Sequence, residues 1–202
     1  MKTDRAAVDK TPSAGRPRDR RIDAAVLAAA VQLLTEVGYA NVTMAAIADR
    51  AGTTKTALYR RWSSKAELVH EAVFPVVPSA LSVPEGDFAA DVRAMIAGAR
   101  EVFTSPVVRA ALPGLVSDVS ADADLSARVL DRLHGLFEVV RVRVEHAMAR
   151  GEIPAEVDAD RLIEIIGGAT LLHVLLHPGA DLDDDWLQQT AAIVTHGVSR
   201  AR

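Results

Sequence analysis

The sequence predicts an all-α protein with an N-terminal helix-turn-helix unit and a larger helical domain after it. Apolar residues recur at helical period from residue 22 to near the C-terminus, and no segment shows the alternation of a strand. Ala48, Gly52 and Leu58 have helix-turn-helix spacing: a small residue permits close approach, a glycine ends the first helix, and a leucine returns the second to the core. The 202 residues are enough for one small and one medium domain.

Residues 1–18 are rich in Pro, Gly, Ser and Arg, and they predict a disordered arm. Arg16, Arg18, Arg20 and Arg21 lie at its end, where basic arms often reach phosphates or the minor groove. A merely solubilising tail is the alternative for the first dozen residues. A first helix is expected from Ile22 to Val37, and Gly38 ends it.

Three short helices are expected next, each opened by a hydroxyl side chain. The N-caps are Thr43, Thr54 and Ser64, and Ser64 with Glu67 forms a capping box. The fourth helix should end near Pro75 or Pro78, before a linker over residues 79–86. The remaining patterns predict helices over Phe88–Thr104, over Val107–Val119 with an interruption at Pro113-Gly114, and over Asp122–Arg150.

The last two helices are expected over Asp160–Leu176 and Asp184–Arg200. The first is apolar around nearly its whole circumference, so it should be buried on both sides, one side against a second subunit. Two-fold symmetry makes such a surface self-complementary. The expected dimer interface consists of Leu162, Ile165, Leu172, Leu176, Trp186, Thr190, Ile193, Val194 and Gly197.

Composition bounds the class of protein. The absence of cysteine excludes disulfides and thiolate metal sites and fits a reducing cytoplasm. No apolar leader begins the chain, and the longest near-apolar run, Leu162–Leu176, is too short for a bilayer, so we expect no membrane partner. Residues 1–68 carry 12 Lys and Arg against 7 Asp and Glu, whereas the rest carries 11 against 20. A basic segment that coincides with a helix-turn-helix indicates a polyanion partner.

The segment after the helix-turn-helix resembles the signature of the tetracycline-repressor (TetR) family of bacterial transcription regulators. It consists of Leu58-Tyr59, Trp62 and Ser64-Lys65-Ala66-Glu67-Leu68, and Gly38-Tyr39, Thr43 and Ile47-Ala48 match upstream. Most members have Phe where Trp62 stands, and Thr53-Thr54-Lys55-Thr56 replaces the commoner valine-serine-x-glycine. The operator sequence therefore cannot be carried over.

This resemblance, which covers Ile22 to Leu68, implies a DNA-binding domain over residues 19–64 and a ligand-binding and dimerisation domain over 65–202. It implies a cytoplasmic, nucleoid-associated homodimer that binds a palindromic double-stranded operator and a small-molecule effector. Tyr59 and Lys65 resemble the family's phosphate contacts. The candidate DNA-binding residues are Arg18, Arg20, Thr43, Thr54, Lys55, Thr56, Ala57, Tyr59, Arg60 and Lys65.

Plainer roles remain open for these residues and for the effector site. Thr43, Thr54 and Ser64 could serve only as caps, and Tyr59 could be a half-buried core aromatic. Leu58 and Trp62 are assigned to the core. A largely apolar effector is expected among Phe103, Leu112, Leu115, His134, Phe137, Val140, Ile166, Thr170 and His173, with a filled core as the alternative.

Enzymatic chemistry finds little support. The sequence contains no nucleophile elbow, Walker loop, dinucleotide fingerprint or His-Glu-x-x-His motif, so we expect no cofactor. His173 and His177 could share a metal at i and i+4, but no third ligand lies nearby in the sequence. The rivals to an effector-controlled repressor are therefore an architectural or effector-free DNA-binding regulator and an unrecognised metal-dependent enzyme.

Overall fold

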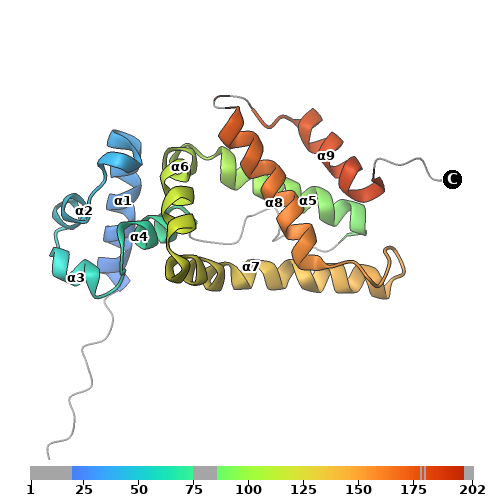
Figure 1. The fold of residues 1–202 in the computed structure, drawn as a ribbon, viewed down its shortest axis with the longest axis horizontal. Helices are drawn as coiled ribbons and strands as arrows, with labels where there is room; N and C mark the ends of the chain where they lie inside the picture. Colours follow the sequence, from blue (N-terminus) through green and yellow to red (C-terminus); the bar gives the residue numbers. More distant parts are fainter. Residues whose placement is uncertain (1–19, 75–85, 178, 180, 198–202) are drawn as a thin grey trace, which may run out of the picture.

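The computed structural model describes residues 20–74, 86–177, 179 and 181–197, and within these ranges all regular structure is helical. The helices are α1 (Arg20–Asn41), α2 (Met44–Arg50), α3 (Lys55–Tyr59), α4 (Lys65–Val73), α5 (Phe88–Thr104), α6 (Pro106–Ala121), α7 (Ala123–Ala149), α8 (Ala159–Leu176) and α9 (Asp184–His196). Figure 1 shows α1 to α4 at one end of an elongated molecule and α5, α7, α8 and α9 at the other. The expected arm and the 79–85 part of the linker lie outside the described residues.

The first four helices form around one apolar core. Ile47, Leu58 and Trp62 are completely enclosed there, together with Val26 of α1. Gly38 and Gly52 adopt positive φ angles of 72° and 64°, which side chains other than glycine rarely tolerate, and these turns end α1's regular part and follow α2. α1 is long and apolar enough to span a membrane by length and composition alone, but its side chains Val26, Leu33 and Leu34 are buried in this core.

The predicted caps occur where the sequence placed them. The Thr43, Thr54 and Ser64 hydroxyls accept hydrogen bonds from the backbone N–H of Ala46, Ala57 and Glu67, respectively. The capping box differs in one partner: the Glu67 carboxylate accepts from the Ser63 N–H and hydroxyl, at 2.8 and 2.6 Å, and not from Ser64. α4 ends at Val73, before Pro75.

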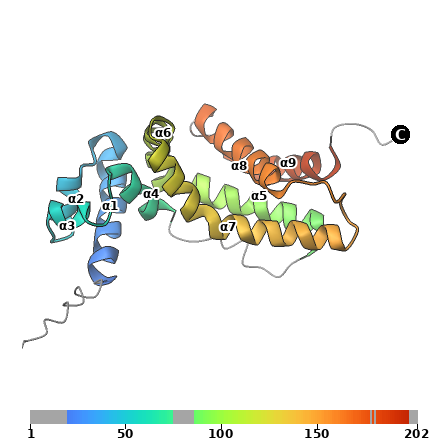
Figure 2. The ribbon, with the colours of Figure 1, turned by 60° about the horizontal axis from the view of Figure 1, so that its bottom comes forward.

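The two ends of the molecule are joined by α6 as well as by α4. In Figure 2 both helices lie between α1 to α3 on one side and α5, α7, α8 and α9 on the other. The expected interruption at Pro113-Gly114 is wrong, because α6 continues through it. Gly114 instead lets the Tyr39 ring approach, since a Cβ there would lie 2.0 Å from a ring carbon. The Tyr39 hydroxyl donates to Asp118 at 2.5 Å.

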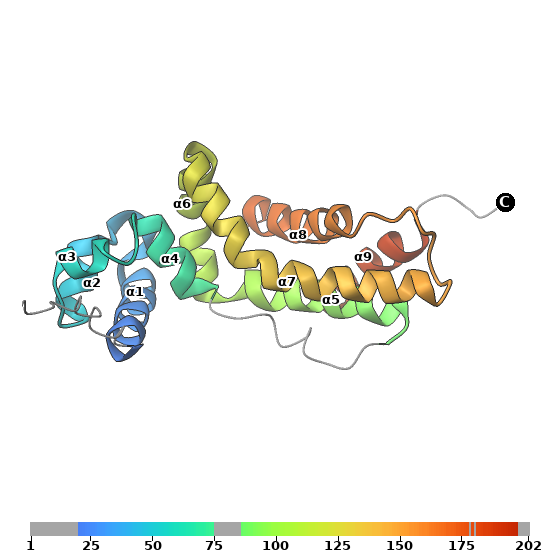
Figure 3. The same ribbon diagram turned by 90° about the horizontal axis from the view of Figure 1, so that it is seen from below.

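The C-terminal helices enclose a second apolar core. Val92, Ile96, Val140, Val144 and Ile166 from α5, α7 and α8 meet in it, and Leu187 and Ala191 of α9 cover one side. Figure 3 shows α5 and α7 running beside each other. A buried ion pair, Arg143 with Asp91 at 2.6 Å, joins these two helices. The observed bounds of α5, α7 and α8 match the predicted ones within one residue, whereas α9 ends at His196, four residues early.

Candidate DNA-binding surface and effector cavity

The amino end of α3 forms an exposed polar surface. Thr54, Lys55 and Thr56 are exposed there, and Ala57 is partly exposed. Tyr59 is 49% exposed, so it is not a core aromatic, and the Lys55 ammonium lies 5.6 Å from its ring centroid. Leu58 and Trp62 point inward and are fully buried, as predicted. One face of α3 therefore holds the unit together while the other presents hydroxyl, ammonium and phenol groups to a partner.

The remaining candidates are distributed around this surface. Thr43 and Arg60 are exposed. Lys65 is partly buried, and its ammonium donates to the Tyr39 carbonyl at 3.0 Å and lies 3.9 Å from the Tyr39 ring centroid. It therefore fixes the end of α1 in addition to any phosphate contact. Arg18 and the Arg20 side chain lie outside the described residues.

Two ion pairs fix the orientation of the helices behind this surface. Arg61, just after α3, pairs with Asp23 of α1 at 2.6 Å. Arg50 of α2 makes a bidentate contact with Glu36 of α1, with both distances 2.8 Å. These arginines are engaged within the fold, so Lys55 and Arg60 are the better candidates for a new partner.

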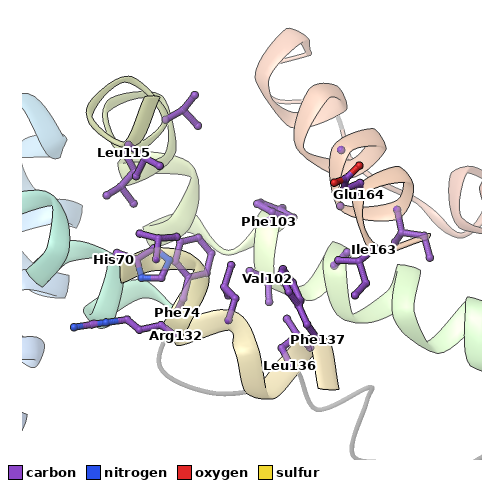
Figure 4. Close-up of a pocket in the computed structure, with 18 of the residues that line it drawn as sticks. His70, Phe74, Val102, Phe103, Leu115, Arg132, Leu136, Phe137, Ile163 and Glu164 are labelled. Carbon is purple, nitrogen blue, oxygen red and sulfur yellow. The ribbon is translucent and has the colours of Figure 1, made fainter. Parts of the chain in front are cut away.

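A cavity of about 870 Å³ lies among α4, α5, α6, α7 and α8. Figure 4 shows His70, Phe74 and Arg132 toward one end and Ile163 and Glu164 toward the other. Of the residues expected to form an effector site, six line it: Phe103, Leu112, Leu115, Phe137, Val140 and Ile166. The lining is mostly aliphatic and aromatic, which suits an apolar molecule.

The structure places the other three expected residues elsewhere. Thr170 is fully enclosed, and its hydroxyl donates to the Ile166 carbonyl at 2.8 Å. His134 faces outward on α7, 3.9 Å from Glu138. The His173 ring stacks on the His177 ring with 4.7 Å between their centroids, and it makes an edge-to-face contact with Trp186 with 5.7 Å between centroids. No group of three His, Cys, Asp or Glu side chains able to hold a metal occurs within the described ranges.

Sequence reasoning missed the contribution of α4 to the cavity. His70 and Phe74 line it, with ring centroids 4.9 Å apart. Burial and the nearby Arg132 guanidinium lower the His70 pKa to about 4, so its imidazole is neutral near pH 7. Gly135, Gly167 and Gly168 also line the cavity, and their missing side chains leave it wide. The helical spacing of His70 and Phe74 was visible in the sequence, but not the helices facing them.

Side chains on α8 and α9 leave an apolar outer face. Ile165, Leu172, Leu176 and Ile193 are 50%, 57%, 65% and 56% exposed, whereas large apolar side chains elsewhere are mostly buried. We call these four residues the outer apolar face. Gly197 is also exposed. The prediction that Leu162 lies in the dimer interface is wrong, because this side chain packs into the chain's own core. Trp186, Thr190 and Val194 are only partly exposed.

Comparison with known proteins covers both halves of the chain. Residues 26–72 match the model for bacterial regulatory proteins of the tetR family, and residues 83–194 match the tetracyclin repressor-like C-terminal domain. The DNA-binding transcriptional repressor TetR of Mycobacteroides abscessus is 33% identical over 173 residues, or 81% of this chain and 86% of that protein. The transcriptional regulator AqdR of Rhodococcus erythropolis is 28% identical over 184 residues, with coverages of 89% and 86%.

Solved structures show the same architecture. The TetR family transcription regulator SCO0332 superimposes with a TM-score of 0.69 at 31% identity, covering 89% of this chain and 99% of that one. FadR from Bacillus subtilis, in complex with stearoyl-CoA, gives a TM-score of 0.66 at 14% identity, with coverages of 87% and 99%. The second likeness is one of fold alone.

Proposed function

Because the chain belongs to the TetR family of bacterial transcription regulators, we propose that it is a dimeric repressor released from a palindromic operator by an apolar effector. One observation above all supports this proposal: the same chain has an exposed, polar recognition helix and a cavity of about 870 Å³ lined mainly by apolar groups. The cavity favours this reading over an effector-free regulator. We propose that the protein is located in the cytoplasm. We also propose that its basic N-terminal arm adds contacts to DNA phosphates.

Dimerisation is proposed through the outer apolar face of α8 and α9. Two copies would bury these leucine and isoleucine side chains against each other and present two recognition helices. Paired recognition helices address half-sites about one helical turn or more apart, and symmetry of the protein requires symmetry of the DNA.

The direct test is to incubate the purified protein with fragments of bacterial genomic DNA and to sequence those it retains. We expect enrichment of an inverted repeat. Enrichment without any inverted symmetry would exclude the dimeric repressor, and the absence of enrichment would exclude sequence-specific binding.

Lys55→Ala is expected to lower affinity for the enriched site by about 1–3 kcal/mol and to relax specificity at one base pair, because Lys55 is exposed at the amino end of α3. Binding measured across single-base variants of the site gives this value. Arg93→Ala is the control: it also removes one positive charge, but from an exposed position on α5. An equal loss in both variants would indicate a general charge effect, not base recognition.

Ala99→Phe is expected to fill part of the cavity and to weaken binding of a neutral apolar dye such as Nile red by about tenfold, since Ala99 lines the cavity. Dye fluorescence during titration measures the affinity. Val142→Phe, on an exposed position of α7, is the control. Unchanged affinity in Ala99→Phe, with loss in Val142→Phe, would place the dye outside the cavity.

A further inference from the structure

The indole of Trp62 connects the recognition helix to a side chain that lines the cavity. Trp62 lies three residues after the end of α3 and is fully buried. Its Nε1–H donates to the Glu71 carboxylate of α4 at 2.8 Å. The same Glu71 oxygen lies 2.6 Å from a guanidinium nitrogen of Arg132 on α7. Arg132 in turn lines the cavity.

A second, parallel connection strengthens this one. Glu67, one turn before Glu71, accepts from the Ser63 N–H and hydroxyl and lies 3.4 Å from Arg132 and 3.5 Å from Arg128. The hydrogen bonds from Ser63 and the charges of Arg128 and Arg132 lower the Glu67 pKa against the opposing effect of its burial, so the group is ionised near pH 7. We call Trp62, Ser63, Glu67, Glu71, Arg128 and Arg132 the interdomain network.

Because its charges are balanced, the geometry of the interdomain network depends on the position of Arg132. Two carboxylates face two guanidinium groups, and the neighbouring His70 is neutral. Figure 4 shows the Arg132 guanidinium directed toward α4, away from Phe137. Its stem therefore faces the cavity while its charge holds α4. A molecule that moves the stem would pull the charge from Glu71, and Glu71 is the acceptor that fixes the indole.

We infer that Trp62 is a positioning residue, and that its hydrogen bond to Glu71, the carboxylate that also pairs with Arg132, transmits the state of the cavity to α3. This rests on the proposed function, because it concerns control of the same DNA-binding surface. Charge-assisted hydrogen bonds are stronger and more directional than neutral ones, so the network has one favoured geometry. A phenylalanine at position 62 would fill most of the same volume but could not donate to Glu71.

The first test needs no DNA. The chain has two tryptophans, so Trp186→Phe leaves Trp62 as the sole indole. In that background, Arg132→Gln is expected to shift the emission maximum of Trp62, whereas Arg141→Gln is not. Arg141 is a matched control, because it lies on the same helix as Arg132, α7, and also pairs with two carboxylates, those of Glu138 and Asp160. Unshifted emission in Arg132→Gln would overturn the connection.

The second test is a double-mutant cycle on affinity for the enriched inverted repeat. Trp62→Phe and Arg132→Gln are each expected to lower it by about fivefold or more, and the double variant no further than the larger single loss. Arg132→Lys should restore part of the affinity, and Arg141→Gln should leave it unchanged. Circular dichroism establishes that each variant is folded. Additive losses, or no loss, would overturn the inference. If no DNA is enriched, the repressor proposal fails, while the fluorescence test still decides the network.

Discussion

Leu172→Asp is expected to convert the proposed dimer into monomers and to lower affinity for the enriched inverted repeat by about 100-fold or more. Leu172 is 57% exposed at the middle of the outer apolar face, so a dimer through this face would bury the new carboxylate without a partner. A monomer loses the second half-site, and with it the gain that arises when one bound half raises the local concentration of the other. Sedimentation velocity and operator titration measure the two effects.

Leu130→Asp is the matched control for this variant. Leu130 is 55% exposed, almost the same as Leu172, but it lies on α7 and outside the outer apolar face. We expect an unchanged dimer and unchanged operator affinity. If Leu172→Asp also sediments as a dimer, the α8 and α9 assignment is wrong, and an equal effect in both variants would indicate general destabilisation.

Gly114→Ala is expected to lower the free energy of unfolding by about 1–3 kcal/mol. The added Cβ would lie 2.0 Å from one Tyr39 ring carbon and 2.8 Å from Cγ. The ring cannot move away easily, because it is buried and its hydroxyl is bonded to Asp118. Since this contact joins α1 to α6, a loss of operator affinity is expected as well. Urea unfolding provides the free energy.

Gly135→Ala is expected to change the free energy of unfolding in the opposite direction. Gly135 is inside α7, and a Cβ there would meet nothing within 4 Å. Alanine should therefore raise the free energy of unfolding by about 0.5–1 kcal/mol through the lower backbone entropy of the unfolded chain.

A double variant tests the contact between Gly114 and the Tyr39 ring. When Tyr39→Ala is combined with Gly114→Ala, the loss in free energy of unfolding should be smaller than the sum of the losses in the two single variants. Additive losses would show that the ring is not what excludes the Cβ.

Features that depend on residues close together in the sequence were predictable. Thr43, Thr54 and Ser64 cap helices in the structure because a cap involves only its own side chain and the next turn. Helix bounds such as Phe88–Thr104 follow from local stop signals. The family signature around Tyr59 and Trp62 also lies within a few turns, and the family assignment it implied is shown by the matches to both halves of the chain.

Features that depend on which helices meet were decided only by the tertiary structure. α8 is apolar all round, so its sequence could not tell that Leu162 turns inward while Ile165 and Leu172 stay exposed. Whether a side chain borders the cavity, as Phe137 does and Thr170 does not, depends on helix rotation against distant neighbours. Partners 79 residues apart, such as Tyr39 and Asp118, have no local pattern at all.

Trp62 has one feature that the sequence predicted and one that only the tertiary structure decided. Its spacing after Leu58 placed it in the core of the helix-turn-helix unit, because burial follows the helical period. Its N–H, however, needed an acceptor once buried, and several side chains in the sequence could have supplied one. Only the packing of α4 against α7 brings Glu71 and Arg132 to the same place. At this position the sequence therefore determined that the indole would be buried, and the tertiary structure determined which groups it would contact.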